Sequence, residues 1–397
     1  MLKNRFLTIF VCIFASVVLI FGAVLGIVAG VRNARAVVTY ENVRVEAGAL
    51  RYLAAHYKST YIKALRSTGT NAADTEKFWN STDEAGKTYR ELFSASFEEY
   101  IRALVASANV FLTYSSYTKA DEASVEATTS DILKYYADDS EKEFNKVAEK
   151  YGFDYDDFCS AAELLYQAGK AKTVIYGDNG ESLAYSPDEC KKYFETYSHV
   201  SLLFIRTEEV FETDDEGNLV YGDDGSVLTR EMTEEERAER LSMIDKLTSA
   251  IESKKTGGDY QITPQMFELY LEKSDGDAEM HEKGYYFNKN ASATQEFATE
   301  FPEIVDAALE MELYDYAKVD CSIGVCFIYK YDHVDGAYSD SENVFFSDFY
   351  SDAANYLYED ILNTISPEIR VKDKFFETDY AAIPILSEYT ISWWKTV

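Results

Sequence analysis

Cysteine is scarce in this sequence, with five residues among 397. Cys12 lies in an apolar N-terminal stretch, and the other four are scattered along the chain: Cys159, Cys190, Cys321 and Cys326. No C-x-x-C pair and no Cys/His cluster is present, which excludes the usual zinc-ligand patterns. Four scattered cysteines in so long a chain do not form a disulfide framework, and the pairing of one or two bridges among them stays open.

Motifs of the common enzyme classes are missing as well. The sequence contains no phosphate-binding glycine loop, no serine nucleophile elbow and no paired-carboxylate constellation. We therefore expect neither a metal nor a cofactor. His56 stands alone on an apolar helical segment, and we interpret it as a packed or surface histidine rather than a ligand.

Basic residues are few: 38 Lys and Arg stand against 70 Asp and Glu, for a net charge of −32. Because phosphate contacts dominate nucleic-acid affinity, this charge excludes nucleic acid as a partner. It favours solubility and attracts cationic segments. Tyrosine, in contrast, is abundant at 32 residues. Its large ring and polar tip suit half-buried helix interfaces or a surface that grips unfolded polypeptide.

A charge-free apolar run extends over residues 6–31. As a helix it spans roughly 39 Å at about 1.5 Å per residue, more than the roughly 30 Å of a bilayer core. We predict a transmembrane anchor in residues 1–36 of a single-pass cell-membrane protein, with a cytoplasmic N-terminus and an extracytoplasmic bulk. The alternative is a cleaved signal peptide, because Ala34-Arg35-Ala36 fits a cleavage site, although the apolar run is longer than a signal peptide needs.

Residues 37–197 have the pattern of a bundle of amphipathic helices. The clearest helix is predicted from Tyr89 to Tyr117, where apolar side chains recur every three or four residues. Another is predicted from Ile132 to Tyr151, and Asp154 is predicted to cap the helix that follows. The apolar stripe of the 132–151 helix consists of Phe144, Val147 and Tyr151.

Residues 198–333 change to a mixed pattern of strands and helices. The segment from His199 to Arg206 has the composition of a buried strand. The insert 211–230 has two glycine-containing turns between short apolar pieces and is predicted to be a β-hairpin; its acids do not match the spacing of an EF-hand. A capping box at Thr233 is predicted to start a helix here, and another at Ser186 is predicted to start the last helix of the preceding region 37–197.

Four segments occur in a characteristic order here: a helix ending at Ser274-Asp275, then Lys283-Gly284-Tyr285-Tyr286-Phe287, a helix over Phe301–Met311, and a strand over Gly324–Lys330. This order resembles the parvulin type of peptidyl-prolyl isomerase domain. With the helical region ahead of it, the chain resembles the SurA and PrsA extracytoplasmic foldases.

The resemblance implies an α+β fold with four parts. These are the N-terminal transmembrane helix, a helical chaperone-like lobe (37–197) similar to the SurA N-terminal region, and a parvulin-like α/β lobe with an antiparallel sheet (198–333). The fourth part is a C-terminal segment (334–397), whose helix, predicted over Phe345–Ile365, is expected to pack back on the helical lobe.

The resemblance also implies a hydrophobic groove that holds an X-Pro bond. The two histidines that usually face each other in this family fall on Leu202 and Cys326, so the polar core is expected to be lost. Phe287 and Phe301 are the expected groove walls, and Ile304 falls at the proline-binding position. No residue is assigned as catalytic.

His199 precedes the first of these positions by three residues, so on a strand it is expected to point to the opposite face.

Three functions follow as hypotheses. The first is an anchored extracytoplasmic foldase or chaperone that binds unfolded or newly exported polypeptides, with weak or no isomerase activity. The second is an active peptidyl-prolyl cis-trans isomerase, and the third is a non-catalytic adaptor of the cell envelope. The sequence leaves the client, the survival of isomerase activity and the oligomeric state open.

Overall fold

The computed structural model describes residues 35–386 except 215, 217, 223, 224, 277 and 341. The described chain divides into two compact units. Unit 1 contains the residues up to 177 and those from 358 onward, and unit 2 contains residues 178–357. The four-part division expected from the sequence stays a prediction.

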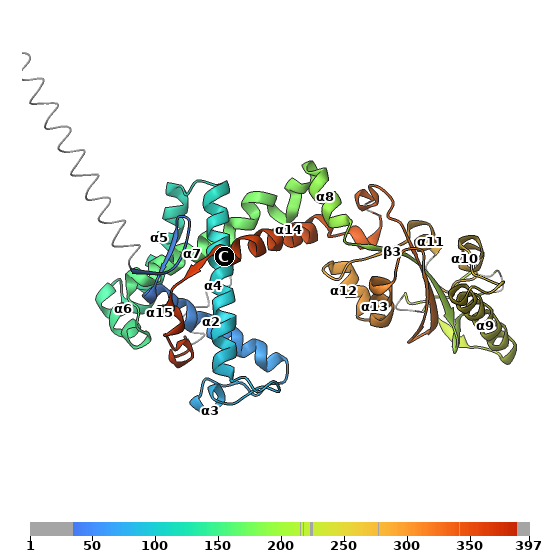
Figure 1. The fold of residues 1–397 in the computed structure, drawn as a ribbon, viewed down its shortest axis with the longest axis horizontal. Helices are drawn as coiled ribbons and strands as arrows, with labels where there is room; N and C mark the ends of the chain where they lie inside the picture. Colours follow the sequence, from blue (N-terminus) through green and yellow to red (C-terminus); the bar gives the residue numbers. More distant parts are fainter. Residues whose placement is uncertain are drawn as a thin grey trace, which may run out of the picture. The chain divides into compact units, whose positions relative to one another are not determined.

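Unit 1 is mainly helical and holds one small sheet (Figure 1). Its main helices are α2 (Ala47–Ser67), α4 (Tyr89–Tyr114), α5 (Lys119–Ala137), α6 (Glu141–Ala148) and α7 (Tyr155–Tyr176). Two short helices are α3 (Glu76–Trp79) and α15 (Asp373–Phe376). The sheet has the order β2-β1-β9 and is antiparallel throughout, with β1 Ala36–Tyr40, β2 Val43–Glu46 and β9 Arg370–Val371.

Reciprocal caps start three of these helices. At α4 the Thr88 hydroxyl accepts from the backbone of Glu91, whose carboxylate accepts in turn from the backbone of Thr88. Such a box satisfies two of the backbone donors that a helix start leaves without partners. The same arrangement starts α5 and α7, with Thr118 and Asp121 in one and Asp154 and Asp157 in the other. The predicted cap at Asp154 is confirmed.

The helix predicted from Ile132 to Tyr151 is wrong as a continuous element. It is broken at Asp138 and Asp139, whose φ angles of 50° and 61° lie in the left-handed region. Aspartate tolerates this region better than most residues, because its short side chain forms local hydrogen bonds. Ser140 then caps α6, so the chain restarts as a separate short helix.

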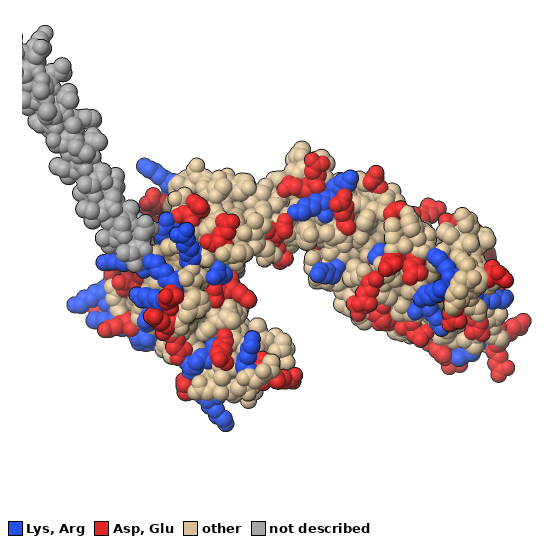
Figure 2. All heavy atoms as spheres, viewed as in Figure 1, with Lys and Arg blue, Asp and Glu red and all other residues tan. Residues whose placement is uncertain are grey.

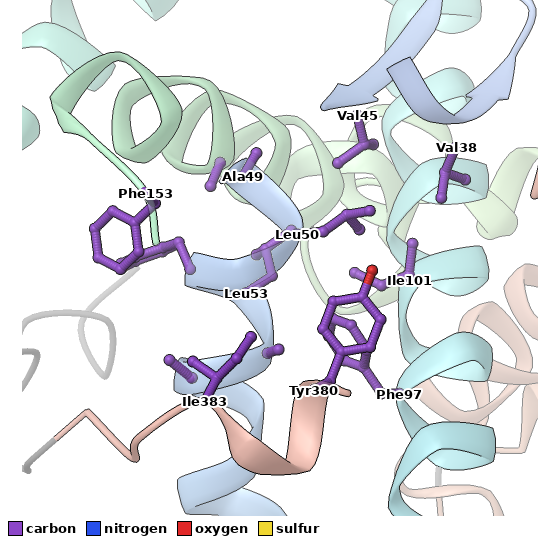
Figure 3. Close-up of a cluster of buried hydrophobic side chains, with 14 of the residues drawn as sticks. Val38, Val45, Ala49, Leu50, Leu53, Phe97, Ile101, Phe153, Tyr380 and Ile383 are labelled. Carbon is purple, nitrogen blue, oxygen red and sulfur yellow. The ribbon is translucent and has the colours of Figure 1, made fainter. Parts of the chain in front are cut away.

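The core of unit 1 joins both ends of the described chain (Figure 3). Tyr380 and Ile383 from the C-terminal segment pack with Leu53 of α2 and Phe97 of α4. The buried Lys58 ammonium holds this segment, because it donates to the carbonyl oxygens of Ala381 and Ile383 at 2.7 Å each and pairs with Asp74. Burial lowers the pKa of Lys58.

Unit 2 is built on a four-stranded antiparallel sheet of order β6-β3-β8-β7. The strands are β3 (Ser198–Arg206), β6 (Tyr285–Phe287), β7 (Tyr316–Cys321) and β8 (Gly324–Tyr331). The helices are α8 (Pro187–Phe194), α9 (Glu234–Thr256), α10 (Pro264–Leu271), α11 (Ala278–Lys283), α12 (Ser292–Ala298), α13 (Pro302–Glu310) and the first part of α14 (Phe349–Ile365). A second, two-stranded sheet pairs β4 (Glu209–Phe211) with β5 (Thr229–Glu231).

Helices cover both faces of the four-stranded sheet. Leu203 and Ile205 of β3 face α9 and α10, where Leu247 and Phe267 are fully buried. The alternate residues of β3 face the side of α13, where Lys330 of β8 donates to the carbonyl oxygens of Ala308 and Met311 near the helix end. A cation suits that end of the helix dipole.

Two predicted helix caps in unit 2 have different outcomes. Thr233 forms the predicted capping box with Glu236 at the start of α9. At α8, Pro187 occupies the first turn as predicted, but the Ser186 side chain makes no cap hydrogen bond. The ψ of 70° at Ser186 departs from the extended ψ angles of 147° to 161° at Thr88 and Thr233.

The predicted fold class needs correction because it included a transmembrane helix. Within residues 35–386, no described helix is long and apolar enough to cross a membrane. The longest, α4, is amphipathic and carries Arg90, Glu98 and Arg102 among its charges. The described chain therefore combines helices with antiparallel sheets, without such a span. The predicted span, residues 6–31, lies outside the described residues.

Candidate polypeptide-binding site

The residues predicted to form a groove lie on one face of the unit 2 sheet. In the register of β3 and β8, Phe204 is opposite Cys326 and Leu202 is opposite Ile328. Directly opposed residues of an antiparallel pair share a face, so Leu202 and Cys326 are on the same side. Phe287 on β6 belongs to this side as well, because its partner is Ser198.

The predicted residues are buried on this face. Leu202, Phe287, Ile304 and Cys326 are at most 1% exposed, and Phe301 is 9% exposed. The Phe297 ring lies between the two predicted walls, 5.1 Å from the Phe287 ring and 5.3 Å from the Phe301 ring. Phe301 also packs on Phe204 at 5.6 Å. The Phe297 side chain therefore occupies the space between the predicted walls.

The polar core expected of an isomerase is not assembled at these positions. Cys326 is fully buried, and burial raises the pKa of its thiol, so it behaves as a small apolar residue. His199 lies on the other face, where its ring stacks on Tyr286 at 4.2 Å and its Nδ1 is 2.8 Å from the Asp332 carbonyl oxygen. Burial lowers the pKa of His199. Its role is therefore packing.

The cysteines show no disulfide among the described residues. Cys159, Cys190, Cys321 and Cys326 are all free thiols. Within residues 35–386 no group of His, Cys, Asp and Glu side chains is arranged to hold a metal ion.

An open apolar cavity lies in unit 1, away from the predicted residues. Its volume is about 280 Å³. A cavity of roughly 150 Å³ holds benzene, so this one has room for a large aromatic side chain. Six of its ten lining residues are aromatic, which favours ring stacking inside it. The lining is Tyr52, Ile132, Tyr136, Phe144, Val147, Ala148, Tyr151, Phe153, Phe158 and Leu386.

The break between α5 and α6 supplies most of this lining. Because α6 is a separate helix, its apolar side chains pack against α7 instead of continuing the line of α5. Phe144 lies 5.4 Å from Phe158 of α7, and Phe153 meets Tyr52 of α2 edge-on at 5.3 Å. Leu386 comes from the C-terminal segment, in which the carbonyl oxygen of Ile383 accepts a hydrogen bond from Lys58.

The rim of the cavity is unusually apolar for a surface. Val147 is 52% exposed on α6, and Tyr136 is 37% exposed on α5. Tyr135, next to it, is 79% exposed and contacts the Tyr136 ring at 4.7 Å. An apolar hollow with exposed apolar side chains at its edge marks a binding surface more often than scattered exposed residues do.

The sequence pattern predicted three of the ten lining residues as a helix stripe, but it did not predict a site here. The stripe of Phe144, Val147 and Tyr151 was visible as helical periodicity and lines the cavity. The contributions of Tyr52 and Phe153 were missed, since they come from a different helix and from a loop. The one available signal was the unusual number of tyrosines, which does not say where they meet.

The two units differ in charge, as the side chains in Figure 2 illustrate. Residues 178–357 contain 41 acidic and 14 basic residues, a net charge of −27. Residues 35–177 and 358–386 contain 28 acidic and 20 basic residues, a net charge of −8. Most of the negative field therefore originates in unit 2.

Comparison with solved structures finds foldases. The chain is similar to foldase protein PrsA from Streptococcus pneumoniae, with 14% identity, a TM-score of 0.19, and coverage of 77% of this chain and 99% of that one. It is also similar to PrsA from Bacillus subtilis, with 13% identity, a TM-score of 0.19, and coverage of 77% and 100%. A third is a peptidylprolyl isomerase (PrsA) from Bacillus cereus, with 14% identity, a TM-score of 0.23, and coverage of 76% and 97%.

No family model and no curated protein matches the chain. Because TM-scores this low do not establish a shared fold, we argue the function from the chain's own residues.

Proposed function

We propose that this protein is a foldase-type chaperone that binds unfolded polypeptide segments through the aromatic cavity of unit 1. The observation that carries the proposal is the cavity of about 280 Å³ with its apolar rim at Val147, Tyr135 and Tyr136. Apolar side chains become exposed when a polypeptide is unfolded, and a folded protein seldom offers one to such a hollow. Exported polypeptides are the proposed clients, in keeping with the sequence resemblance.

The size of the cavity favours weak and reversible binding of a client side chain. Burying one large apolar side chain contributes about 1.5–3 kcal/mol, whereas millimolar affinity corresponds to roughly 4 kcal/mol. One occupied cavity therefore holds a client only briefly, and stable capture needs several contacts along the same chain. A chaperone that must release its client to let it fold benefits from such short residence.

Unit 2 is proposed to be a parvulin-like scaffold with weak or no isomerase activity. An isomerase lowers a barrier of about 18–20 kcal/mol by favouring a twisted amide. That requires a groove that admits the X-Pro bond. The Phe287, Phe297 and Phe301 rings occupy the position expected for it, which supports this part of the proposal.

The test compares two matched surface substitutions. Val147→Glu places a charge at the cavity rim, and Val334→Glu does the same at a 57% exposed valine of unit 2. We expect Val147→Glu to weaken suppression of client aggregation about fivefold, because an apolar client side chain then meets a charge that must stay hydrated. Val334→Glu is expected to leave suppression unchanged. Equal suppression by both variants and the parent protein, at equal thermal stability, would refute the cavity as the site.

Isomerase activity is measured in the same preparations with an X-Pro peptide. No acceleration together with clear suppression supports the chaperone on an inactive scaffold. Acceleration that is lost in Phe301→Ala would make the protein an isomerase instead. Neither activity would favour the adaptor hypothesis.

A further inference from the structure

A second cavity lies on the small sheet of unit 1, and its lining is polar. Its volume is about 640 Å³. The cavity is bounded by the β1–β2 hairpin and the segment around β9. Its lining is Thr39, Tyr40, Glu41, Arg44, Glu368, Arg370 and Lys372.

The strand register gathers the cations on one face. Thr39 on the central strand β1 is opposite Arg44 of β2 on one side and Arg370 of β9 on the other. These three side chains therefore share a face, and Lys372, two residues beyond Arg370, is on the same side. Val38 and Val45 point to the opposite face, into the core. The cations are thus brought together by the fold from positions more than 320 residues apart in sequence.

Two groups at the hairpin are held by the protein itself. The Arg44 guanidinium donates to the carbonyl oxygens of Val43, at 2.8 Å, and Glu41. Glu41 has a φ of 42°, which turns the chain tightly at this point. The Glu368 carboxylate accepts a hydrogen bond from the Tyr40 hydroxyl at 3.2 Å, so this acid already has a partner within the protein. The arginine fork is therefore oriented before any ligand arrives.

The local charge runs against that of the molecule. Three cations face two carboxylates here, whereas residues 35–177 and 358–386 together carry −8 and the whole chain carries −32. Figure 2 shows Lys and Arg side chains gathered at the end of unit 1 where the described chain begins. The cavity is thus a place in an acidic protein where cations outnumber acids.

We propose that this cavity binds a phosphate-bearing anion, with Arg44, Arg370 and Lys372 around the phosphate and the Thr39 hydroxyl as a further donor. Phosphate suits the site better than a carboxylate does. Its several oxygens match an arginine fork and a lysine point charge arriving from different strands, which the two oxygens of a carboxylate do not. The cavity is larger than inorganic phosphate, so a phosphate ester or a lipid headgroup is the expected form.

The experiment measures binding of four probes to the full chain at constant ionic strength. Inorganic phosphate and glycerol 3-phosphate are titrated by calorimetry, with acetate as the anion control. Phosphatidylglycerol vesicles and phosphatidylcholine vesicles are tested by co-sedimentation. The variant Arg370→Gln/Lys372→Gln is compared with Lys374→Gln, which removes a cation of the same segment outside the cavity lining.

The proposal expects binding of a phosphate probe that falls at least tenfold in the double variant and stays unchanged in Lys374→Gln. Binding of the soluble phosphates identifies a free ligand, and binding confined to phosphatidylglycerol vesicles identifies a lipid headgroup. Equal binding of acetate and the phosphates, equal losses in both variants, or no binding of any phosphate probe at millimolar concentration would each overturn it. Thermal melts of both variants establish that they are folded.

Discussion

Two aromatic clusters of this protein, one in each unit, differ in their packing: in one the rings pack on one another, and in the other they line a cavity. On the unit 2 sheet, the rings of Phe287, Phe297 and Phe301 pack on one another at the predicted groove. In unit 1, six aromatic side chains line a hollow of about 280 Å³. Aromatic content therefore does not distinguish a core from a binding site. A closed core forms where a neighbouring element supplies a side chain that fills the space beside the rings. At α6 none of the described elements supplies such a side chain.

The units also differ in what their charge can do. Unit 2, at −27, attracts cationic segments over a distance but offers no hollow at its predicted groove, whereas unit 1, at −8, offers an apolar cavity. Electrostatic attraction mainly raises association rates, and apolar contact mainly lowers dissociation rates.

The largest effect is expected for Phe287→Ala in the closed layer. Phe287 is fully buried, so truncation removes its transfer free energy and leaves a void that the sheet cannot close. We expect unit 2 to lose about 3–5 kcal/mol of stability. Urea unfolding with hydrogen exchange by mass spectrometry checks this: β3 and β8 should lose protection while α2 and α4 keep theirs. Loss of protection in both units alike would contradict the contrast.

A smaller effect is expected for Phe153→Ala, the matched truncation in the cavity wall. Phe153 is 7% exposed but borders existing empty space, so little new void is created. We expect a cost of about 2 kcal/mol, close to the transfer term alone. The same urea experiment, now observed on α2 and α7, gives the number. A cost equal to or above that of Phe287→Ala would mean that the cavity wall is packed as tightly as the sheet.

Salt is expected to change client binding by about tenfold. If the field of unit 2 steers cationic unfolded chains, their association rate falls about tenfold between roughly 10 mM and 300 mM salt, as screening shortens the range of the field. Stopped-flow mixing with a cationic and an anionic unfolded peptide of equal apolar content measures this. Identical rates for the two peptides at low salt would remove the role assigned to the charge of unit 2.

The smallest effect expected is a pH dependence carried by buried histidines in both units. Burial lowers the pKa of His56 in unit 1 and of His199 in unit 2 below 6.5. Between the lowered pKa and 6.5 the unfolded chain binds more protons, so stability falls as pH falls through this window. Urea midpoints from pH 7.5 to 5.5 test the sign, and His199→Asn should flatten the slope for unit 2 alone. A midpoint that rises on acidification would contradict the assignment.

Local sequence predicted local structure well. The cap at Asp154 and the capping box at Thr233 start their helices as predicted, because each is complete within four residues. The burial of β3 followed from its composition, and the opposite orientation of His199 and Leu202 followed from strand alternation. Helix continuity across Asp138 was predicted wrongly, since the apolar period continues through a break that the backbone makes with left-handed angles.

The covalent order of residues decided where helices and strands begin, which residues face inward, and how negative the chain is. The first two properties depend on residues a few positions away in the chain, and the third is a sum over the charged residues. Packing alone decided that the unit 2 face is closed, that the α6 stripe borders a hollow, and that Arg44 meets Arg370 across Thr39. The physical reason is that a cavity is the absence of a contact between distant segments. No local pattern records such an absence.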